Sequence, residues 1–502
     1  MSAELRAPGV FPGDAIYIGG HFRKGGGEAV ESLFPADGTL NTIVHCASQE
    51  DVTDALKAAR AALADPAWCD LLPHRRAAWL SRIADAIDKN KEYLAWLQSR
   101  DTGKTLRETT ILVGSAADTM RYYAAVAETA EEAITPSRGP YLTLSRFEPI
   151  GIIGAITPWN SPIASDVQKL APALAAGNAV ILKPSPWSPL TSLALAQIID
   201  ETGLPKGLVS VLPGGAEVGS RLVEDPEIGR IVFTGGTTVG RKIAEVAGKR
   251  LVPVSLELGG KSPTIIRPDA DLDLALAGVL FGIFSSSGQS CIAGSRLFVH
   301  RSLYETFRER LVAATGKLVV GHPFSERTQV APMVHVDHRA AVERWVARAK
   351  EEGGKVLIGG ARPEGADYDD GYYYLPTIIE SLTNEAVCCR EEIFGPVLIL
   401  LPYDDDETLI AQANDNRYGL ACGIWSKDII GALALGRRIT AGTVWINTYK
   451  QFSASTPFGG EKDSGIGREK GLEGMRAYMV QKSYYIDTSQ APHPWARSHE
   501  TD

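Results

Sequence analysis

The sequence predicts an α/β fold in which helices cover buried parallel sheets. After about residue 150, short apolar runs alternate with helical patterns, which is typical of βαβ units. Before that point, residues 50–130 carry apolar side chains at three- to four-residue spacing, as in DVTDALKAARAAL and RRAAWLSRIADAIDKN. This period predicts helices.

The first alternating series contains the strand candidates up to residue 258. Helical stretches separate these candidates, for example SPLTSLALAQIIDETG, which ends at Gly203. The candidates are residues 152–157, 179–183, 208–213, 230–235 and 252–258.

A second series runs from about Asp269 to Asn447, with the strand candidates RLFVH, KVLIGG, VLILLPY and AGTVWIN. The Gly-rich ELGGKSP between the two series is a candidate linker. After the helix-like GREKGLEGMR, the segment AYMVQKSYYIDT predicts a late strand that pairs with another segment or another subunit.

Size and composition are those of an ordinary globular protein. The 502 residues correspond to about two to three domains of ~150 residues. The chain has 44% hydrophobic and 22% charged residues, and this composition excludes disordered and collagen-like proteins. The net charge of −9 argues against a nucleic-acid partner. The basic residues at 241, 242, 249 and 250 are diluted by Glu245 and predict a solvated helix face.

Targeting, membrane and metal signals are missing from the sequence. The start MSAELRAPGVFPGD lacks the apolar segment of a secretory signal, and no run reaches the ~18 apolar residues of a spanning helix. We therefore expect a cytoplasmic protein without a membrane partner. Adjacent Cys388 and Cys389 suit neither a relaxed disulfide nor a tetrahedral metal site, and the nine histidines lack ligand spacing, so no metal is predicted.

Two residues are candidates for catalysis, one as a nucleophile and one as a general base. Cys291 lies in SSSGQSCIAGSR, where small neighbours would let a substrate approach the thiol closely. The alternative is a buried structural thiol, the commoner use of a free cysteine. Glu257 ends an apolar strand pattern, where open α/β sheets place their ligands. It is either a general base or a solvated strand end.

Three further features could bind an oxyanion or a phosphate. Asn160 in TPWNSP is an amide donor or a turn residue. Lys183 in ILKPS could bind ribose hydroxyls or a phosphate, or lie on the surface. In FTGGTTVG, glycines 235, 236 and 240 would bring backbone N–H groups near a phosphate at a helix N-terminus. This motif differs from GxGxxG, so it could equally be a Gly-rich turn.

In their order along the chain, these motifs resemble the aldehyde dehydrogenase superfamily. The resemblance covers roughly residues 15–485. The motifs are PWN with Asn160, KPS with Lys183, FTGGTTVG, LELGGK with Glu257, GQSC with Cys291, EEIFGP with Glu392 and Phe394, Asn447, and PFGGEKDSGIGRE.

The resemblance implies a three-part architecture. A Rossmann-like cofactor domain would comprise residues 1–129 and 150–258, and an α/β catalytic domain residues 259–460. Residues 130–149 and 461–502 would form a β oligomerisation arm and the C-terminal tail. Because such arms bridge subunits, a homodimer or homotetramer is expected.

The resemblance also implies the oxidation of an aldehyde to its acid with NAD(P)⁺. The equivalent of Cys291 attacks the carbonyl carbon, while the Asn160 side chain and the Cys291 N–H hold the oxyanion. Such donors are worth ~3 kcal/mol each. Hydride transfer to the nicotinamide leaves a thioester, and the equivalent of Glu257 activates the water that releases the acid.

By the same resemblance, Glu392 would bind the nicotinamide ribose and Phe394 would pack near the ring. NAD⁺ is the first expectation for the cofactor, but Pro186 stands where many relatives have a glutamate that repels a 2′-phosphate, so NADP⁺ should also be tolerated. The implied cofactor residues are Trp159, Lys183, Ser185, Gly219, Phe233, Gly235, Gly236, Gly240, Leu258, Glu392 and Phe394.

Two departures from the family pattern bear on the chemistry. The phosphate loop reads FTGG where FTGS is common, so Gly236 removes a hydroxyl. Some relatives carry a second acidic residue in the C-terminal GRE segment. We place Leu472 at that position, with Glu473 one residue off, and so expect deacylation to depend on Glu257 alone.

The implied substrate pocket is mostly small and polar, which indicates a functionalised aldehyde such as a hydroxy-, amido- or carboxy-bearing semialdehyde. Lys450 could attract an anion at its mouth, but we favour a plain surface lysine. The implied pocket residues are Ser115, Ser161, Ser165, Gln168, Ser285, Ser290, Ile292, Phe452 and Phe458.

Three alternatives stay open. The same thioester could acylate coenzyme A, although relatives that do so generally lack the general-base glutamate. The chain could be a non-catalytic structural or binding protein that kept the fold. It could also be a cysteine hydrolase, although no histidine lies near Cys291 or Glu257 in the sequence.

Overall fold

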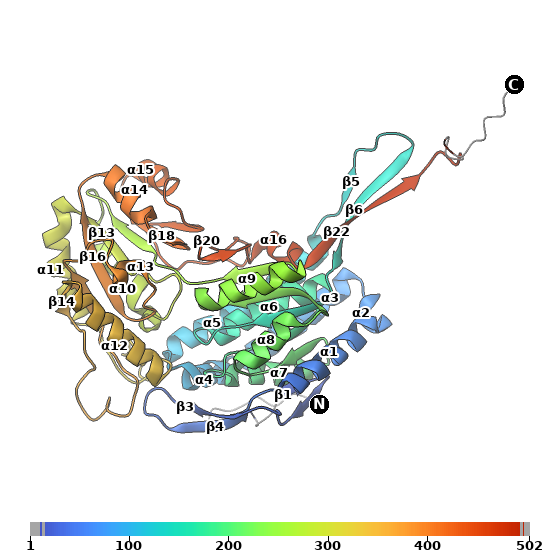
Figure 1. The fold of residues 1–502 in the computed structure, drawn as a ribbon, viewed down its shortest axis with the longest axis horizontal. Coiled ribbons are helices and arrows are strands. Elements are labelled where there is room, and N and C mark those ends of the chain that lie inside the picture. The colour runs from blue at the N-terminus through green and yellow to red at the C-terminus, as the bar shows by residue number, and fades with distance from the viewer. Residues whose placement is uncertain (1–10, 13–15, 492–494, 496–502) are drawn as a thin grey trace.

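The structure is a computed structural model that describes residues 11–12, 16–491 and 495. The expectations about the first ten residues and about 492–494 and 496–502 therefore lie outside the described residues. Figure 1 shows two lobes and a thin arm that projects from them. Among the described helices, none is both long and apolar enough to cross a membrane. The described residues also contain no group of three or more His, Cys, Asp or Glu side chains that could hold a metal ion.

The first lobe is built on an eight-stranded sheet in the order β2-β1-β9-β8-β7-β10-β11-β21. Its centre is parallel and confirms the first predicted series: β9 (Val209–Val211), β8 (Ala179–Lys183), β7 (Ile152–Ile156), β10 (Ile228–Thr234) and β11 (Val254–Glu257). Antiparallel strands close the two edges: β1 (Ile16–Ile18) and β2 (His21–Arg23) on one side, β21 (Gly465–Ile466) on the other.

Helices pack against this sheet, α1 and α6 on β8 and α8 on β7. The predicted helical region 50–130 is confirmed by α1 (Gln49–Ala64), α2 (Pro66–Cys69), α3 (Pro73–Lys89), α4 (Lys91–Thr102) and α5 (Leu106–Thr129). The remaining helices of this lobe are α6 (Pro162–Ala176), α7 (Leu190–Glu201), α8 (Ala216–Glu224) and α9 (Thr237–Arg250). The short β1 and β2 and the hairpin of β3 (Ala29–Leu33) and β4 (Leu40–His45) were not among the predicted strands.

The second lobe is built on a seven-stranded sheet, parallel except for β14 at its edge. In order the strands are β14 (Lys355–Ile358), β15 (Thr377–Glu380), β16 (Val397–Tyr403), β13 (Arg296–His300), β12 (Pro263–Ile266), β18 (Ala421–Trp425) and β19 (Thr443–Ile446). The helical segments are α10 (Leu272–Phe284), η1 (Ser285–Gly288), η2 (Arg301–Leu303), α11 (Tyr304–Thr315), α12 (Val336–Glu351), α13 (Val387–Arg390), α14 (Asp406–Asn414) and α15 (Ile429–Gly436).

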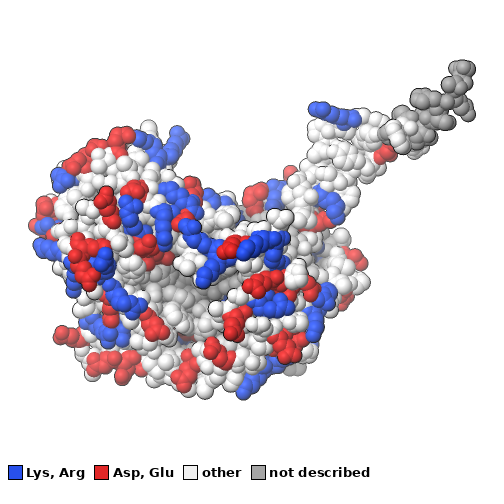
Figure 2. Space-filling view, in the orientation of Figure 1, with Lys and Arg blue, Asp and Glu red and all other residues white. Residues whose placement is uncertain are grey.

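The arm is a three-stranded antiparallel sheet of β5 (Ala133–Thr135), β6 (Tyr141–Pro149) and β22 (Met479–Asp487). The predicted late strand thus pairs with another segment of its own chain, β6, along its whole length. Most of the arm surface visible in Figure 2 carries no charge.

Residues 461–487, which belong to the predicted arm-and-tail range, form several elements that pair with different parts of the chain. β20 (Glu461–Lys462) pairs with β17 (Tyr418–Gly419), β21 joins the first lobe's sheet beside β11, and α16 (Gly471–Arg476) packs on α6. Only β22 belongs to the arm. Residues 461–478 therefore bind the two lobes together before the chain enters the arm.

Candidate active site

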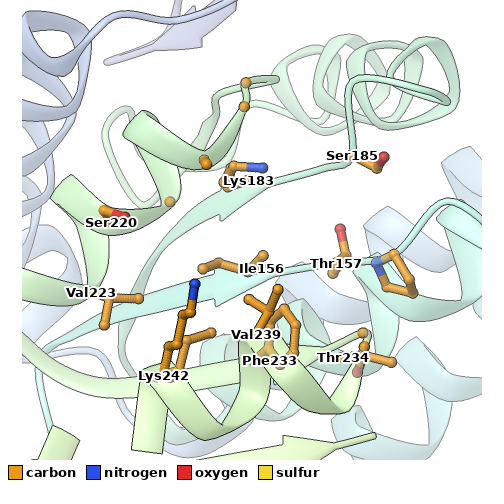
Figure 3. A pocket seen from close by; sticks show the side chains of 18 of the residues that line it. Ile156, Thr157, Lys183, Ser185, Ser220, Val223, Phe233, Thr234, Val239 and Lys242 are labelled. Atoms are coloured by element: carbon orange, nitrogen blue, oxygen red, sulfur yellow. The ribbon is translucent and has the colours of Figure 1, made fainter. Parts of the chain in front are cut away.

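A cavity of about 550 Å³ opens where β7, β8 and β10 end. Figure 3 shows that the amines of Lys183 and Lys242 point into it, Lys183 from β8 and Lys242 from α9. The carboxyl ends of parallel strands are where open α/β sheets bind ligands. The predicted solvated face of α9 is confirmed, because Arg241, Lys242 and Lys249 are exposed, and Lys242 also lines this cavity.

A second cavity of about 210 Å³ contains the candidate catalytic residues. Its lining includes Asn160, Glu257, Cys291 and Glu392. The two cavities share the lining residues 158, 159 and 234–236. They are therefore two parts of one cleft, which leads from the first lobe's sheet to the thiol of Cys291.

The Gly-rich loop between β10 and α9 forms one wall of this cleft. A Cβ at Gly235 would lie 2.5 Å from the Phe233 ring, and one at Gly240 would lie 2.4 Å from Leu258, so both positions need glycine for packing. Gly236 meets nothing within 4 Å, so a serine would fit there. Because Gly236 caps α9 without a side-chain hydrogen bond, the first N–H groups of the helix stay open to a phosphate.

The remaining cofactor candidates line the same cleft. Lys183 is only 7% exposed, and burial lowers its pKa to about 8. A Cβ at Gly219 would lie 3.5 Å from Cε of Lys183, which is an ordinary contact, and Ser185 lines the cavity nearby. The Trp159 ring lies edge-on to Phe394, with centroids 5.2 Å apart.

Cys291 follows a strained turn. Ser286 and Ser287 have φ angles of 56° and 54°, which non-glycine residues seldom adopt. Glu108 accepts a hydrogen bond from the Ser286 N–H at 2.6 Å, and the Ser287 hydroxyl donates to the carbonyl of Ala331 at 2.5 Å. These contacts hold the backbone that presents the thiol.

Burial raises the pKa of the Cys291 thiol to about 12, and the charges of Glu392 and Glu257 contribute. The resting thiol is therefore protonated near neutral pH. Asn160 lies close by, because its Nδ2 donates to the carbonyl oxygen of Gln289 at 3.1 Å. One amide N–H is used in this contact and the other remains for a ligand.

Glu257 is buried at the end of β11, and neither carboxylate oxygen has a hydrogen-bond partner among the described residues. Burial, and after it the charge of Glu469, raises its pKa well above the usual range. A Cβ at Gly459 would lie 3.0 Å from its Oε1, so the glycine lets the C-terminal segment approach the carboxylate.

Glu469 corrects the prediction that no second acidic residue stands near Glu257. The glutamate of GRE is itself the buried residue: it forms an ion pair with Lys169 and accepts a hydrogen bond from Gln168. The sequence prediction assigned this position to Leu472, which lies too far along the chain. Only the packing of this segment against α6 reveals the contact, because 300 residues separate Glu469 from Lys169.

Glu392 lies in the loop between α13 and β16 and lines the same cavity. Its carboxylate accepts the N–H of Gly260 at 2.9 Å, and burial raises its pKa to about 7. A Cβ at Gly259 would lie 2.4 Å from Oε2 of Glu392. The ELGGKSP segment does link the two sheets, from β11 to β12, and its glycines make room for this carboxylate.

The predicted substrate residues separate into groups. Ile292 and Phe458 belong to the apolar cluster that includes Cys291, and Phe452 contacts Phe458 at a centroid distance of 5.3 Å. Gln168 instead hydrogen-bonds to Glu469. Ser161 precedes α6 and Ser165 lies on it, Ser290 adjoins Cys291, Ser115 is exposed on α5, and Ser285 is contacted by Lys450.

Sequence comparisons agree with this geometry. The aldehyde dehydrogenase family model matches residues 22–484. The DhaS protein of Bacillus subtilis, whose name assigns it to the aldehyde dehydrogenases, is 37% identical over 475 residues, which cover 94% of this chain and 95% of that protein.

Two solved structures match nearly the whole fold. An NAD⁺ complex of a Bacillus cereus aldehyde dehydrogenase has a TM-score of 0.92 and 36% identity, and the match covers 94% of this chain and 96% of that one. A Staphylococcus aureus betaine aldehyde dehydrogenase in complex with NAD⁺ has a TM-score of 0.94 and 34% identity, with 97% of both chains covered. With its cleft, its motif order and these matches, the chain belongs to the aldehyde dehydrogenase family.

Proposed function

We propose that the protein oxidises a polar aldehyde to its carboxylic acid with NAD(P)⁺, through a thiohemiacetal and a thioester on Cys291. The observation that supports this most directly is that Cys291, Glu257, Asn160 and Glu392 line one cavity, and that this cavity continues into the larger cleft of the first lobe. A nucleophile, a base, an oxyanion donor and a cofactor ligand are thereby brought together.

The cleft fits a dinucleotide. Its larger part, about 550 Å³, lies within the ~300–1,000 Å³ of ligand pockets. The open N-terminus of α9 suits the pyrophosphate, Lys183 suits a ribose, and Glu392 suits the nicotinamide ribose. The bound dinucleotide supplies the hydride acceptor. Relatives of this chain were solved with NAD⁺, which supports NAD⁺ as the cofactor here.

NADP⁺ fits the same cleft. Pro186 lines it and brings no carboxylate to repel a 2′-phosphate, while Lys183 and Lys242 bring amines from two sides. We therefore expect both cofactors to be used.

In the first half-reaction, Sγ of Cys291 bonds to the carbonyl carbon and the thiol proton passes to a water molecule in the cleft. Negative charge moves to the carbonyl oxygen, where the free N–H of Asn160 and the backbone N–H of Cys291 stabilise it. That charge drives the carbon to release a hydride, and a thioester remains.

In the second half-reaction, Glu257 takes a proton from water and the hydroxide adds to the thioester carbon. The carbon–sulfur bond then breaks, which releases the carboxylic acid and leaves Cys291 as a thiolate. A carboxylate with a raised pKa is a stronger base than a solvated one. The charge of Glu469, which is paired with Lys169, contributes to this raised pKa.

The test is a panel of aldehydes with NAD⁺ and NADP⁺, followed by absorbance of the reduced cofactor and by analysis of the product. We expect reduced cofactor and free acid in equal amounts, and none of either from Cys291→Ala. Acyl-CoA formed in place of acid would favour the acylating alternative. No reduced cofactor from any aldehyde, with cofactor binding intact, would refute the proposal.

A further inference from the structure

Two lysines near the nucleophile have no counter-ion. Lys450 and Lys104 come from distant parts of the chain, and among the described residues no carboxylate lies within 4.0 Å of either amine. The Lys450 amine donates instead to the hydroxyl of Ser285 at 2.7 Å. Lys104 is only 4% exposed. Ammonium groups taken out of water without a counter-ion are costly, so proteins seldom keep them without a function.

Both lysines are rigidly held. Lys450 has a left-handed backbone, φ 54°, and follows Tyr449, whose buried ring packs on Trp445 at 4.9 Å. Lys104 follows the left-handed Gly103, and the Ser99 hydroxyl donates to its carbonyl at 2.6 Å. These contacts fix the backbone from which the two side chains extend, which favours a preformed binding site.

Lys450 lies near both an exposed aromatic ring and the nucleophile. The Lys450 amine sits 5.7 Å from the centroid of the Phe281 ring, and that residue is 50% exposed. On the other side, Lys450 is close enough to Cys291 for each to influence the other's pKa. An aldehyde whose carbonyl has reached Cys291 can therefore extend its far end past Lys450.

The carboxylate of Glu108 does not neutralise the charges of Lys450 and Lys104. Glu108 is engaged by the backbone and hydroxyl groups of Thr105 and Ser286. Two amines and one carboxylate leave room for one further negative charge. We propose that Lys450, with Lys104 beside it, binds a carboxylate on the far end of the aldehyde, so that the preferred substrates are oxo acids. This proposal rests on the proposed function and specifies its substrate class.

The charge of the subsite should depend on pH. Burial, and after it the charge of Lys104, lowers the pKa of Lys450 to about 7, while Glu108 and Cys291 act in the opposite direction. Lys450 therefore loses its proton as the pH rises through about 7, and affinity for an anion falls. KM for an oxo acid should rise above that pH, whereas KM for a neutral aldehyde should not follow it.

The experiment compares Lys450→Met with the wild type on pairs of equal length, from 4-oxobutanoate and butanal to 7-oxoheptanoate and heptanal. We expect kcat/KM for the best oxo acid to fall at least about tenfold more than for its neutral partner, mainly through KM, because a charge-assisted contact is lost. Lys450→Arg should recover part of the loss. Lys249→Met, an exposed lysine on α9, is the control and should not change the ratio.

Equal losses for oxo acids and neutral aldehydes at every length would overturn the subsite, since they would indicate a general effect on Cys291. No loss for either class would overturn it as well. Both results leave aldehyde oxidation intact. Failure of the proposed function differs from them, because the wild type would then oxidise neither class.

Discussion

At the residue scale, the cleft is defined by buried groups whose pKa values differ from those in water. Burial raises the pKa values of Cys291, Glu257 and Glu392, which favours the neutral form of each side chain. Low polarity around a charge increases every later electrostatic interaction with it. The pKa values of these side chains should therefore change when a charged ligand binds in the cleft.

The role of Glu257 can be isolated by Glu257→Gln. The amide cannot accept a proton, so the thioester should form once per active site and then hydrolyse ~10²–10⁴-fold more slowly. Rapid-mixing measurements should show a burst of reduced cofactor followed by almost no turnover. Glu473→Gln, on an exposed carboxylate, is the control. Normal steady-state turnover of the Glu257 variant would refute the assignment.

The pH dependence of alkylation checks the state of Cys291. Only the thiolate reacts, and a pKa of about 12 means that the thiolate fraction rises about tenfold per pH unit throughout the neutral and alkaline range. Iodoacetamide should therefore inactivate the cofactor-free enzyme faster and faster up to about pH 10. Mass spectrometry of the Cys291→Ala variant measures the background alkylation of the exposed Cys69. A plateau near pH 8 would contradict the raised pKa.

Cofactor preference depends on position 186. We expect the wild-type preference for NAD⁺ over NADP⁺ in kcat/KM to stay below about a thousandfold, and Pro186→Glu to raise it about tenfold, because a carboxylate beside the 2′-phosphate is repulsive. Pro186→Ala removes the ring without adding charge and should leave the ratio near that of the wild type. An unchanged ratio in the glutamate variant would place the 2′-phosphate elsewhere.

At the scale of elements, α6 is tied to the C-terminal segment by the buried pair of Lys169 and Glu469. Lys169→Met leaves the Glu469 charge unpaired, which typically costs ~3–5 kcal/mol of unfolding free energy. Denaturant unfolding measures this cost. Breaking the exposed pair of Glu473 and Arg476 is the control and should cost ~1 kcal/mol or less.

Variants on the two sides of this ion pair should shift the pH profile of kcat in opposite directions. Glu469 raises the pKa of Glu257 and Lys169 lowers it. Because Glu257 acts as a base only when deprotonated, Lys169→Met should move the rise of kcat to higher pH, and Glu469→Gln to lower pH. Superimposable pH profiles would mean that deprotonation of Glu257 does not limit turnover.

At the scale of the whole molecule, the arm leaves apolar side chains uncovered. Its pairing register places Ile134, Leu142 and Ile486 on one face, all exposed. A projecting sheet with an uncovered apolar face is typical of subunit contacts. We propose that this face meets another subunit, as expected from the sequence.

Ile134→Asp tests this, because Ile134 is 75% exposed and a charge there would have to be desolvated in an interface. Light scattering should show a smaller assembly than that of the wild type. Ser483→Asp places the same charge on the opposite face of the arm and is the control. An unchanged mass for the Ile134 variant would assign assembly to another surface.

Local pattern was sufficient for much of the fold. The central strands of the first sheet and the helices before residue 130 match the prediction, since period and burial of a long apolar run are local properties. The motif order around Cys291 and Glu257 was sufficient for the family. Strands of three residues, such as β1, carry too little periodicity to be predicted.

Only the tertiary structure decided which charges lose water and which segments meet. It brings Glu469 to Lys169 and Glu257, places β21 beside β11, and half-buries Lys450, which the sequence favoured as a surface lysine. The physical reason is common to all three: desolvation and long-range pairing depend on residues hundreds of positions apart, and no local period records them. The sequence by itself determined the family and singled out the candidate reacting groups, and tertiary packing sets the surroundings that shift their pKa values.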